Sequence, residues 1–438
     1  MAFSQSLPWS EPLDLAAAID EPYWALLYSG VQAGYSGRYS LLAHGLLEKI
    51  ESEDFCALEA RLTSDRPAFD NAWFGYLSYG LKHSLEQLPP DRSNWLALPD
   101  LCMMRFLQVY HFDHKKRAVT LWSTTPPPAG GRPGGGHDSP NIISPHPNTP
   151  PAGEGIISSL RSNMTRQEYL DKAAHVIERI HAGDLYQANL TRKFMGEFAE
   201  APKPFDLFRK LCAVSPAPYS AFLRLGDTHV LSSSPELFLR IDAEGRICTR
   251  PIKGTAPRFS DAGKDAASRD ALQASAKDKA ENLMIADLMR NDLSRACIPG
   301  SVATERLFEV TSHATIHHMS STITGRKRPD CSTLEAVQCC FPPGSMTGAP
   351  KLAAIRLCTE MEALERGIYS GAIGWFGGDG SAELSVVIRT LLLQGNRFEF
   401  QVGGGIVADS TPEQELQELI DKAGGICRCL GIGVDELQ

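Results

Sequence analysis

Two pairs of acidic residues begin two segments that have the apolar spacing of helices. Asp278 and Glu281 form one pair, and Glu415 and Glu418 form the other. Residues at i and i+3 lie on the same side of a helix, so each pair presents two carboxylates together. Like charges at this spacing repel, and a cation held between the two helices would relieve the repulsion. Carboxylates and water are the ligands that Mg²⁺ prefers. The alternative is that both pairs belong to ordinary solvated helix faces.

A lysine in a Gly/Pro-rich turn is the candidate nucleophile. Lys253 precedes Gly254 in the segment TRPIKGTAPR, which is typical of a strand end followed by a turn. Partial desolvation of such an amine lowers its pKa and makes it nucleophilic. Glu236 lies seventeen residues earlier, at the exit of a Ser-rich strand, where it can act as a general acid or cap backbone amides. An ordinary surface lysine is the alternative interpretation of Lys253.

Two glycine-rich segments can bring backbone close to a ligand. The segment PGSMTGAPK contains Thr347 and leads into a predicted helix at 350–365. Backbone N–H groups at a helix start bind anionic groups, although the GxxxxGK[ST] pattern of a Walker loop is absent. The second segment, 403–405, is a run of three glycines after a predicted strand, where backbone can approach a ligand closely.

Two further side chains are candidates for substrate contacts. Arg389 ends the segment SVVIR and can bind a carboxylate through two hydrogen bonds. His318, in TIHHMSSTITG, is either a hydrogen-bonding or acid–base group or a packed histidine. Together the candidates predict a Mg²⁺-dependent enzyme for a small polyanion, without naming the substrate. A Schiff-base lysine enzyme acting on a carbonyl compound is the alternative, which borohydride trapping would identify.

The elements that must position these residues follow from capping and periodicity. Thr165 and Glu168 have the form of a capping box, which predicts a helix through Ile180. Hairpin-like turns at Gly226-Asp227 and Gly395-Asn396 join neighbouring strand-like segments. These segments lie at 185–195, 219–225, 228–241, 246–252, 384–394 and 397–402. Their irregular alternation with helices predicts a large mixed or antiparallel α+β fold and not a βαβ array.

One Pro/Gly-rich segment divides the chain. Residues 124–155 lose hydrophobic periodicity, which predicts a flexible loop. The loop separates an N-terminal region, 1–123, from a catalytic region, 156–438. Within the N-terminal region we expect strands at 72–79 and 102–112 and a helix at 41–50.

Composition excludes several classes of protein. The chain has 438 residues, of which 43% are hydrophobic and 22% are charged, enough for a large core. Lys and Arg number 43 and Asp and Glu number 52, so the net charge is 43 − 52 = −9, which argues against a nucleic-acid partner. No apolar run is long enough for a membrane helix, and residues 1–21 lack the layout of a signal peptide. The eleven cysteines include no CxxC motif and are expected to be free thiols in a cytoplasmic protein.

Nine segments, taken in order, resemble the chorismate-utilising enzymes. This family includes anthranilate synthase component I, aminodeoxychorismate synthase component I, isochorismate synthase and salicylate synthase. The segments are GDLYQANLTRKF, SSSPELFL, RPIKGTAPR, AENLMIADLMRNDLSR, HHMSSTITG, PPGSMTGAPK, YSGAIGWF, VVIRT and GGGIVADSTPEQELQE. The resemblance implies the α/β sandwich of anthranilate synthase component I, an α+β fold with large mixed or antiparallel sheets flanked by helices. The site would lie between two layers.

The resemblance also implies roles for individual residues. Mg²⁺ would bridge the substrate's ring carboxylate to Glu281 and Glu418, with Asp278 and Glu415 supporting it through water. His318 would face the ring's leaving-group region. The predicted substrate contacts, most of them on the pyruvyl side, are Gly254, Thr255, Thr347, Tyr369, Arg389, Gly403, Gly404 and Gly405.

Two positions discriminate among the branches of the family. Lys253, in PIKGT, resembles the lysine of the aminodeoxychorismate synthases, where anthranilate synthases usually carry a small residue. Gln187 stands where isochorismate and salicylate synthases have a water-activating lysine, so ammonia is the expected final nucleophile. The resemblance thus implies that chorismate and ammonia give 4-amino-4-deoxychorismate, for 4-aminobenzoate and folate biosynthesis. A covalent intermediate on Lys253 and a general acid, Glu236, are implied with it.

The source of ammonia and two alternative functions complete the expectations. No glutaminase region is evident in these 438 residues, so ammonia would come from a separate glutamine amidotransferase subunit or from solution. Anthranilate synthase component I is one alternative, which the fluorescence of its product would identify. A non-catalytic binding homologue is the other, and the two acidic pairs and Arg389 argue against it.

Overall fold

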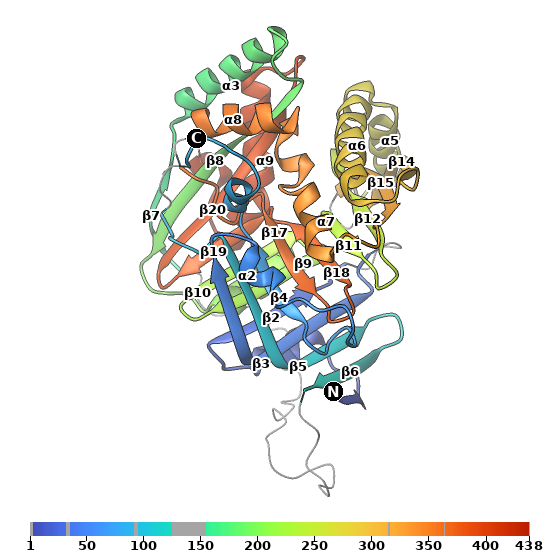
Figure 1. Ribbon diagram of the computed structural model, residues 1–438. Helices are drawn as coiled ribbons and strands as arrows, with labels where there is room; N and C mark the ends of the chain where they lie inside the picture. The colour runs from blue at the N-terminus through green and yellow to red at the C-terminus, as the bar shows by residue number, and fades with distance from the viewer. Residues whose placement is uncertain are drawn as a thin grey trace, which may run out of the picture.

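The computed structural model describes residues 3–31, 36–91, 95–124, 155–313, 316–362 and 364–437. Almost all of the predicted loop 124–155 lies outside the described residues. Within them, twenty strands form one connected sheet in which neighbouring strands pair antiparallel, and helices flank it (Figure 1). The predicted α+β fold is confirmed.

The sheet divides into two arms at β3 (Tyr39–Ser52) and β5 (Leu101–Asp113), which pair with each other. The first arm continues from β3 through β2 (Tyr23–Tyr28), β9 (Tyr219–Leu225), β10 (Thr228–Ser234), β19 (Thr390–Gln394) and β20 (Arg397–Ile406) to β8 (Gln187–Phe198). At its end, β8 also pairs with β7 (Ile157–Ser162) and β16 (Gly348–Ala349).

The second arm starts from β5. It continues through β4 (Trp73–Leu77), β17 (Ala372–Phe376), β18 (Ala382–Val386), β11 (Leu237–Ile241) and β12 (Arg246–Arg250) to β15 (Ile316–Arg326). β13 (Ile252–Pro257) and β14 (Ala303–Ser312) pair with β15, while β6 (Ala118–Ser123) and β1 (Phe3–Leu7) extend the sheet beyond β5. Strands of the N-terminal and catalytic regions therefore share one sheet.

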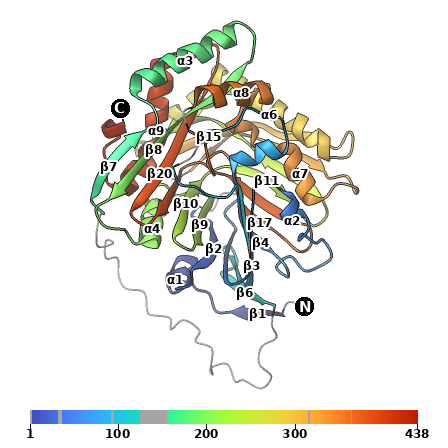
Figure 2. The ribbon, with the colours of Figure 1, turned by 60° about the vertical axis from the view of Figure 1, so that its left-hand side comes forward.

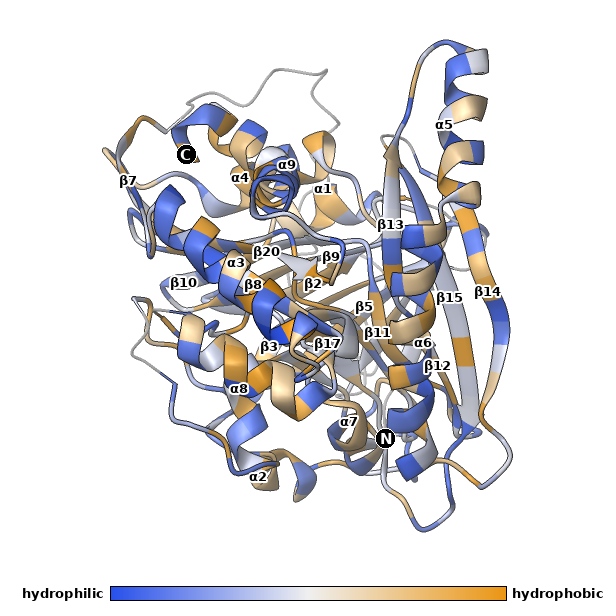
Figure 3. Cartoon of the chain, turned by 90° about the horizontal axis from the view of Figure 1, so that it is seen from above, coloured by the Kyte–Doolittle hydropathy of each residue, from blue (hydrophilic) through white to orange (hydrophobic). Residues whose placement is uncertain are grey.

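Each arm is covered by its own helices (Figures 1 and 2). The first arm carries α3 (Arg166–His181), α4 (Pro204–Val214), α8 (Lys351–Met361) and α9 (Pro412–Leu430). The second carries α5 (Ala262–Ala274), α6 (Ala276–Ala296) and α7 (Thr333–Cys340), and Figure 3 shows α6 beside β13. Short helices α1 (Pro12–Ala17) and α2 (Cys56–Glu59) and the 3₁₀ turns η1 (Tyr79–Ser84), η2 (Gly344–Met346) and η3 (Val434–Leu437) complete the fold.

The two sets of helices cover separate apolar cores. Tyr169 and Leu419 pack with Phe194 in the core beneath α3 and α9. Ile285 and Leu293 of α6 belong to a second core. Because each arm has its own core, the strand ends that lie between the arms remain available for polar side chains.

Local signals in the sequence located several elements correctly. The capping box is present, since Thr165 Oγ1 accepts a hydrogen bond from Glu168 N at 3.2 Å and Glu168 Oε2 accepts one from Thr165 N at 2.6 Å. Both predicted hairpins occur, as β9–β10 and β19–β20. The predicted strand 228–241 is two strands that break at Pro235, which has no N–H for the ladder.

The helix predicted at 41–50 is wrong, because these residues lie in β3, between β2 and β5. Leu41, Leu42 and Ala43 are consecutive buried residues, as in a strand that is covered on both faces. Gly45 has a φ of +74°, and the register shifts just beyond it. This irregularity offsets the strand's alternation and gives the apolar residues a helix-like spacing.

Two expectations about the chain as a whole can be compared with the structure. No helix among the described residues is long and apolar enough to cross a membrane. All eleven cysteines are free thiols, and most of them are buried.

Candidate active site

The two arms of the sheet meet where Lys253 of β13 approaches the end of β20. A methyl group added to Gly405 would lie 3.0 Å from Lys253 Nζ and 2.3 Å from Gln187 Nε2. Only glycine leaves room for both side chains at this point. Gln187 is fully buried, and neither polar atom of its side chain has a hydrogen-bond partner among the described residues. Such a group is available to a ligand or a water molecule.

The Lys253 amine has an altered acidity. Burial lowers its pKa, and the nearby Lys422 charge lowers it further. The carboxylates of Glu281, Glu236 and Glu418 act in the opposite direction, but the pKa remains below its ordinary value. A lowered pKa increases the fraction of neutral amine, which is the nucleophilic form.

Glu236 connects β10 to β11 and is 5% exposed. Burial raises the pKa of its carboxyl to about 7, although a hydrogen bond with Ser345 and the charge of Lys253 both oppose the rise. A carboxyl with this pKa is present in both protonation states near neutral pH. It is therefore suited to donating a proton and taking it back.

One carboxylate of each acidic pair, Glu281 on α6 and Glu418 on α9, acts on the other across the space between the two helices. Glu281 is partly buried on α6, and its pKa is raised by burial, with a further contribution from the negative charge of Glu418 on α9. The two carboxylates are therefore within electrostatic range of each other. Lys422 Nζ lies 2.7 Å from Glu418 Oε1 and donates a hydrogen bond to Gly403 O at 3.1 Å. Lys422 therefore links Glu418 on α9 to Gly403 on β20.

The supporting carboxylates also lie next to predicted substrate contacts. A methyl group on Gly254 would lie 2.9 Å from Asp278 Oδ1, and one on Gly404 would lie 2.9 Å from Glu415 Oε2. Glu415 Oε1 accepts a hydrogen bond from Ser410 at 2.6 Å, whereas its Oε2 is buried with no hydrogen-bond partner among the described residues.

These oxygens are hard donors of the kind that Mg²⁺ prefers. In the described part of the chain, no three His, Cys, Asp or Glu side chains are grouped closely enough to hold a metal ion by themselves. Substrate and water oxygens would have to complete the coordination. The donor set fits Mg²⁺ on that condition.

Thr347 and Tyr369 are brought together by Asn189 of β8. Thr347 follows η2 and is buried, and its carbonyl accepts a hydrogen bond from Asn189 N at 2.9 Å. Burial raises the pKa of the Tyr369 hydroxyl, and a side-chain hydrogen bond with Asn189 opposes the rise. Asn189 lies two residues from Gln187, so these side chains belong to the same end of β8.

The side chains of Arg389 and His318 have polar atoms that lack hydrogen-bond partners among the described residues. Arg389 lies between β18 and β19 with a φ of +50°, which is uncommon for a residue other than glycine, and its side chain has no hydrogen-bond or ion-pair partner among the described residues. His318 on β15 is 3% exposed, faces Thr255 of β13, and has two unpartnered ring nitrogens within the described ranges. Burial, together with the charge of Arg389, holds the pKa of His318 well below its usual range. A neutral imidazole and a guanidinium are thus both available to a ligand.

Sequence reasoning missed two residues of this cluster. Lys422 lies one helical turn after Glu418, a spacing that is visible in the sequence, but its bond to Gly403 depends on how α9 packs on β20. Ser345, which hydrogen-bonds Glu236, lies in the segment PGSMTGAPK, but nothing in that segment indicates which distant carboxyl it contacts. Among the predicted residues, the structure places Lys253 near Gly405, Asp278 near Gly254 and Glu415 near Gly404.

The fold and this cluster define a chorismate-binding enzyme, and residues 22–428 match the model of the chorismate binding enzyme family. The chain belongs to this family. It is 38% identical over 422 residues to the aminodeoxychorismate synthase of Streptomyces griseus, covering 90% of this chain and 56% of that protein, so it spans only about half of that relative's length. It is 33% identical over 453 residues to aminodeoxychorismate synthase component 1 of Klebsiella aerogenes, covering 96% and 97% of the two chains.

A solved structure supports the same conclusion about the fold. Anthranilate synthase component I from Streptococcus pneumoniae TIGR4 has a TM-score of 0.75 to this chain at 26% identity, covering 90% of this chain and 93% of that one. The fold and the family predicted from the nine segments are therefore confirmed.

Proposed function

We propose that the chain converts chorismate and ammonia into 4-amino-4-deoxychorismate, acting as component I of an aminodeoxychorismate synthase. The observation that carries the proposal is the placing of the Lys253 amine against the glycine run at Gly405, with a lowered pKa and within electrostatic range of Glu236, whose pKa is about 7. The side chain of Gln187 lies next to Gly405, as Lys253 does, and an amide does not activate water as a base. The 33–38% identity to aminodeoxychorismate synthases supports the same branch of the family.

The chemistry consists of two allylic displacements. The lone pair of the neutral Lys253 amine attacks C2, both double bonds of the conjugated ring diene shift by one position, and the C4 hydroxyl leaves as water with a proton from Glu236. Ammonia then attacks C4, both double bonds return to their original positions, and the C2–N bond breaks with its electrons on Lys253. The Glu236 carboxylate takes the proton that the added nitrogen loses. The amine thus replaces the hydroxyl on the same face.

The remaining predicted residues bind and orient the substrate. In the proposal Arg389, Thr347 and Tyr369 hold the pyruvyl side together with the backbone of 403–405, while Gly254 and Thr255 contact the substrate beside Lys253. The neutral His318 hydrogen-bonds near the departing hydroxyl, which it can do without giving up a proton.

The carboxylates of the two acidic pairs have the role of metal ligands in this proposal. Glu281 and Glu418 would hold Mg²⁺, with Asp278 and Glu415 acting through water. When bound, Mg²⁺ would neutralise the ring carboxylate of the substrate.

Product identification tests the proposal. The purified chain is incubated with chorismate, Mg²⁺ and ammonium, and the product is identified by mass spectrometry and NMR. We expect 4-amino-4-deoxychorismate. A fluorescent product, anthranilate, would instead identify the second candidate, anthranilate synthase component I, which the structural likeness to that enzyme favours. Absence of any chorismate turnover would contradict both functions.

A further inference from the structure

We propose that Glu362 and Arg366 are positioning residues, whose buried ion pair fixes the segments that carry Thr347, Tyr369 and Gly403. The pair lies at the end of α8 and in the segment that follows it. The inference rests on the proposed function only in taking chorismate as the ligand that these segments bind.

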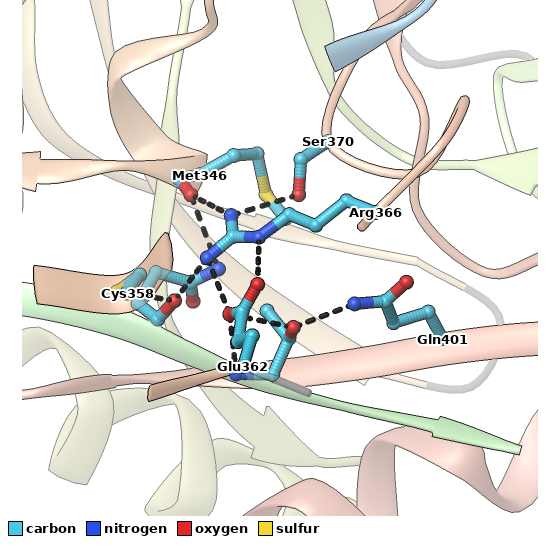
Figure 4. Close-up of polar contacts among 8 residues, drawn as sticks. Met346, Cys358, Glu362, Arg366, Ser370 and Gln401 are labelled. Atoms are coloured by element: carbon cyan, nitrogen blue, oxygen red, sulfur yellow. Dashed lines mark hydrogen bonds and ion pairs between the residues drawn. The ribbon is translucent and has the colours of Figure 1, made fainter. Parts of the chain in front are cut away.

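The ion pair is fully enclosed. The Arg366 side chain is 1% exposed and that of Glu362 is 6% exposed. Arg366 Nη2 lies 2.7 Å from Glu362 Oε1, and its Nε lies 2.9 Å from Oε2, so the pair is bidentate (Figure 4). Burying two charges is costly unless the remaining donors and acceptors are also satisfied. The partners of those remaining groups show what the pair holds in place.

Arg366 first fixes the loop that contains Thr347. Its Nη1 donates a hydrogen bond to Met346 O at 2.8 Å, and Asn189 Nδ2 donates to the same carbonyl at 3.2 Å. This carbonyl belongs to the peptide group that links Met346 to Thr347. The orientation of Thr347 is therefore set by two buried donors.

The same guanidinium holds the segment of Tyr369. Nη1 also donates to Ser370 Oγ at 3.2 Å, and Nη2 donates to Asn189 O at 2.7 Å. Ser370 has a φ of +68°, a left-handed conformation that a residue other than glycine adopts only when its surroundings impose it. Asn189 also hydrogen-bonds Tyr369. Five hydrogen bonds from one side chain thus join three segments.

Glu362 fixes the strand opposite the glycine run. Its Oε1 accepts hydrogen bonds from Thr191 N at 3.1 Å and from Thr191 Oγ1 at 2.7 Å, while Gln401 Nε2 donates to that hydroxyl at 2.6 Å (Figure 4). Thr191 faces Gly403 across the β8–β20 ladder, and a methyl group on Gly403 would lie 2.7 Å from Thr191 Cγ2. Movement of Thr191 would therefore shift the backbone at Gly403.

Arginine is required for this arrangement because its planar group presents several donors in fixed directions. A lysine would keep the charge beside Glu362 but could not reach Met346, Ser370 and Asn189 together. We therefore expect Arg366→Lys to weaken chorismate binding, beyond any loss of stability. A buried pair elsewhere on the same strands, Lys193 and Glu399 at 3.3 Å, provides a matched control.

The experiment measures the dissociation constant of chorismate by calorimetry with Mg²⁺, with every variant and its reference protein carrying Lys253→Ala so that no covalent adduct forms. KM and kcat with ammonium, and the melting temperature, are measured with Lys253 present. We expect Arg366→Lys to raise Kd and KM together by about tenfold or more, with a smaller change in kcat. Thr191→Val removes one hydrogen bond to Glu362, and we expect it to raise Kd by about threefold. Glu399→Gln should lower the melting temperature and leave Kd within about twofold of the reference value.

Thr191→Val keeps the proposal testable if Arg366→Lys does not fold. The proposal is overturned if folded Arg366→Lys, or Thr191→Val where Arg366→Lys does not fold, binds chorismate as tightly as the reference protein does. It is also overturned if Glu399→Gln weakens binding as much as they do. A wild-type chain that binds chorismate but forms another product would contradict the proposed function, while these binding comparisons would still test the positioning role.

Discussion

At the scale of single residues, Lys253 combines a lowered pKa with an amine that occupies the space where a side chain at position 405 would lie. If it is the nucleophile, wild-type protein incubated with chorismate and Mg²⁺ in the absence of ammonia should carry a covalent adduct. Mass spectrometry should find the adduct on the peptide that contains Lys253. Lys253→Ala should lack the adduct. Its rate of product formation should be lower than that of wild type by about a hundredfold or more.

The control for this variant is Lys264→Ala, which changes an exposed lysine on α5. It should retain both the adduct and the rate. If Lys253→Ala forms 4-amino-4-deoxychorismate at the wild-type rate, ammonia attacks chorismate directly and the nucleophile assignment is wrong.

Glu236 gives a prediction about stability and pH. Its pKa is raised by burial from 4.5 to about 7, so between these values the folded state keeps a proton that the unfolded chain has lost. This group's contribution to the free energy of unfolding therefore falls as pH rises from 4.5 through 7. Glu236→Gln removes this pH-dependent loss of stability, because an amide does not titrate. The difference in unfolding free energy, variant minus wild type, should increase by about 3 kcal/mol over this range. Urea unfolding at several pH values measures it, and a pH-independent difference would contradict the assigned pKa.

At the scale of elements, α6 and α9 bring one acidic pair each to the strand ends. Glu281→Gln keeps the size of the side chain but removes a charge that Mg²⁺ would need. We expect turnover to fall by about a hundredfold or more, with the melting temperature close to wild type. Titrating Mg²⁺ against the rate makes the measurement.

Asp287→Asn is the control for the metal prediction, because Asp287 lies on the same helix, is 74% exposed and pairs with Arg290. Its Mg²⁺ dependence should match wild type. Normal activity of Glu281→Gln, or full wild-type activity in excess chelator, would refute the assigned metal ligands.

At the scale of the whole molecule, the source of ammonia decides which nitrogen donor the purified chain can use. Relatives carry the name component 1, which implies a further component in those enzymes. We propose that this chain likewise receives ammonia from a glutamine amidotransferase subunit. The purified chain should use ammonium salts, better at higher pH where more free ammonia is present, and should use glutamine only after that subunit is added. Glutamine-dependent product from the purified chain alone would contradict the proposal.

The sequence by itself determined the local elements and the family. The capping box at Thr165, the hairpin turn at Gly226 and the i, i+3 carboxylates each depend on residues a few positions apart. Such short-range hydrogen bonding and periodicity are readable without a fold. The nine segments likewise identified the family that the later comparisons show.

Only the tertiary structure decided which distant segments meet. Residues 41–50 became a strand because β5 pairs with them along one edge and β2 pairs with residues 41–43 along the other, which overrides their helix-like spacing. Lys253 meets Gly405, and Arg366 holds Asn189, across large distances in the sequence. These contacts depend on the order of strands in the sheet and on how helices pack over it. The polarity pattern of a single segment carries no information about its partner strand. Neither the approach of Lys253 to Gly405 nor the buried pair of Glu362 and Arg366 was therefore predictable from the sequence.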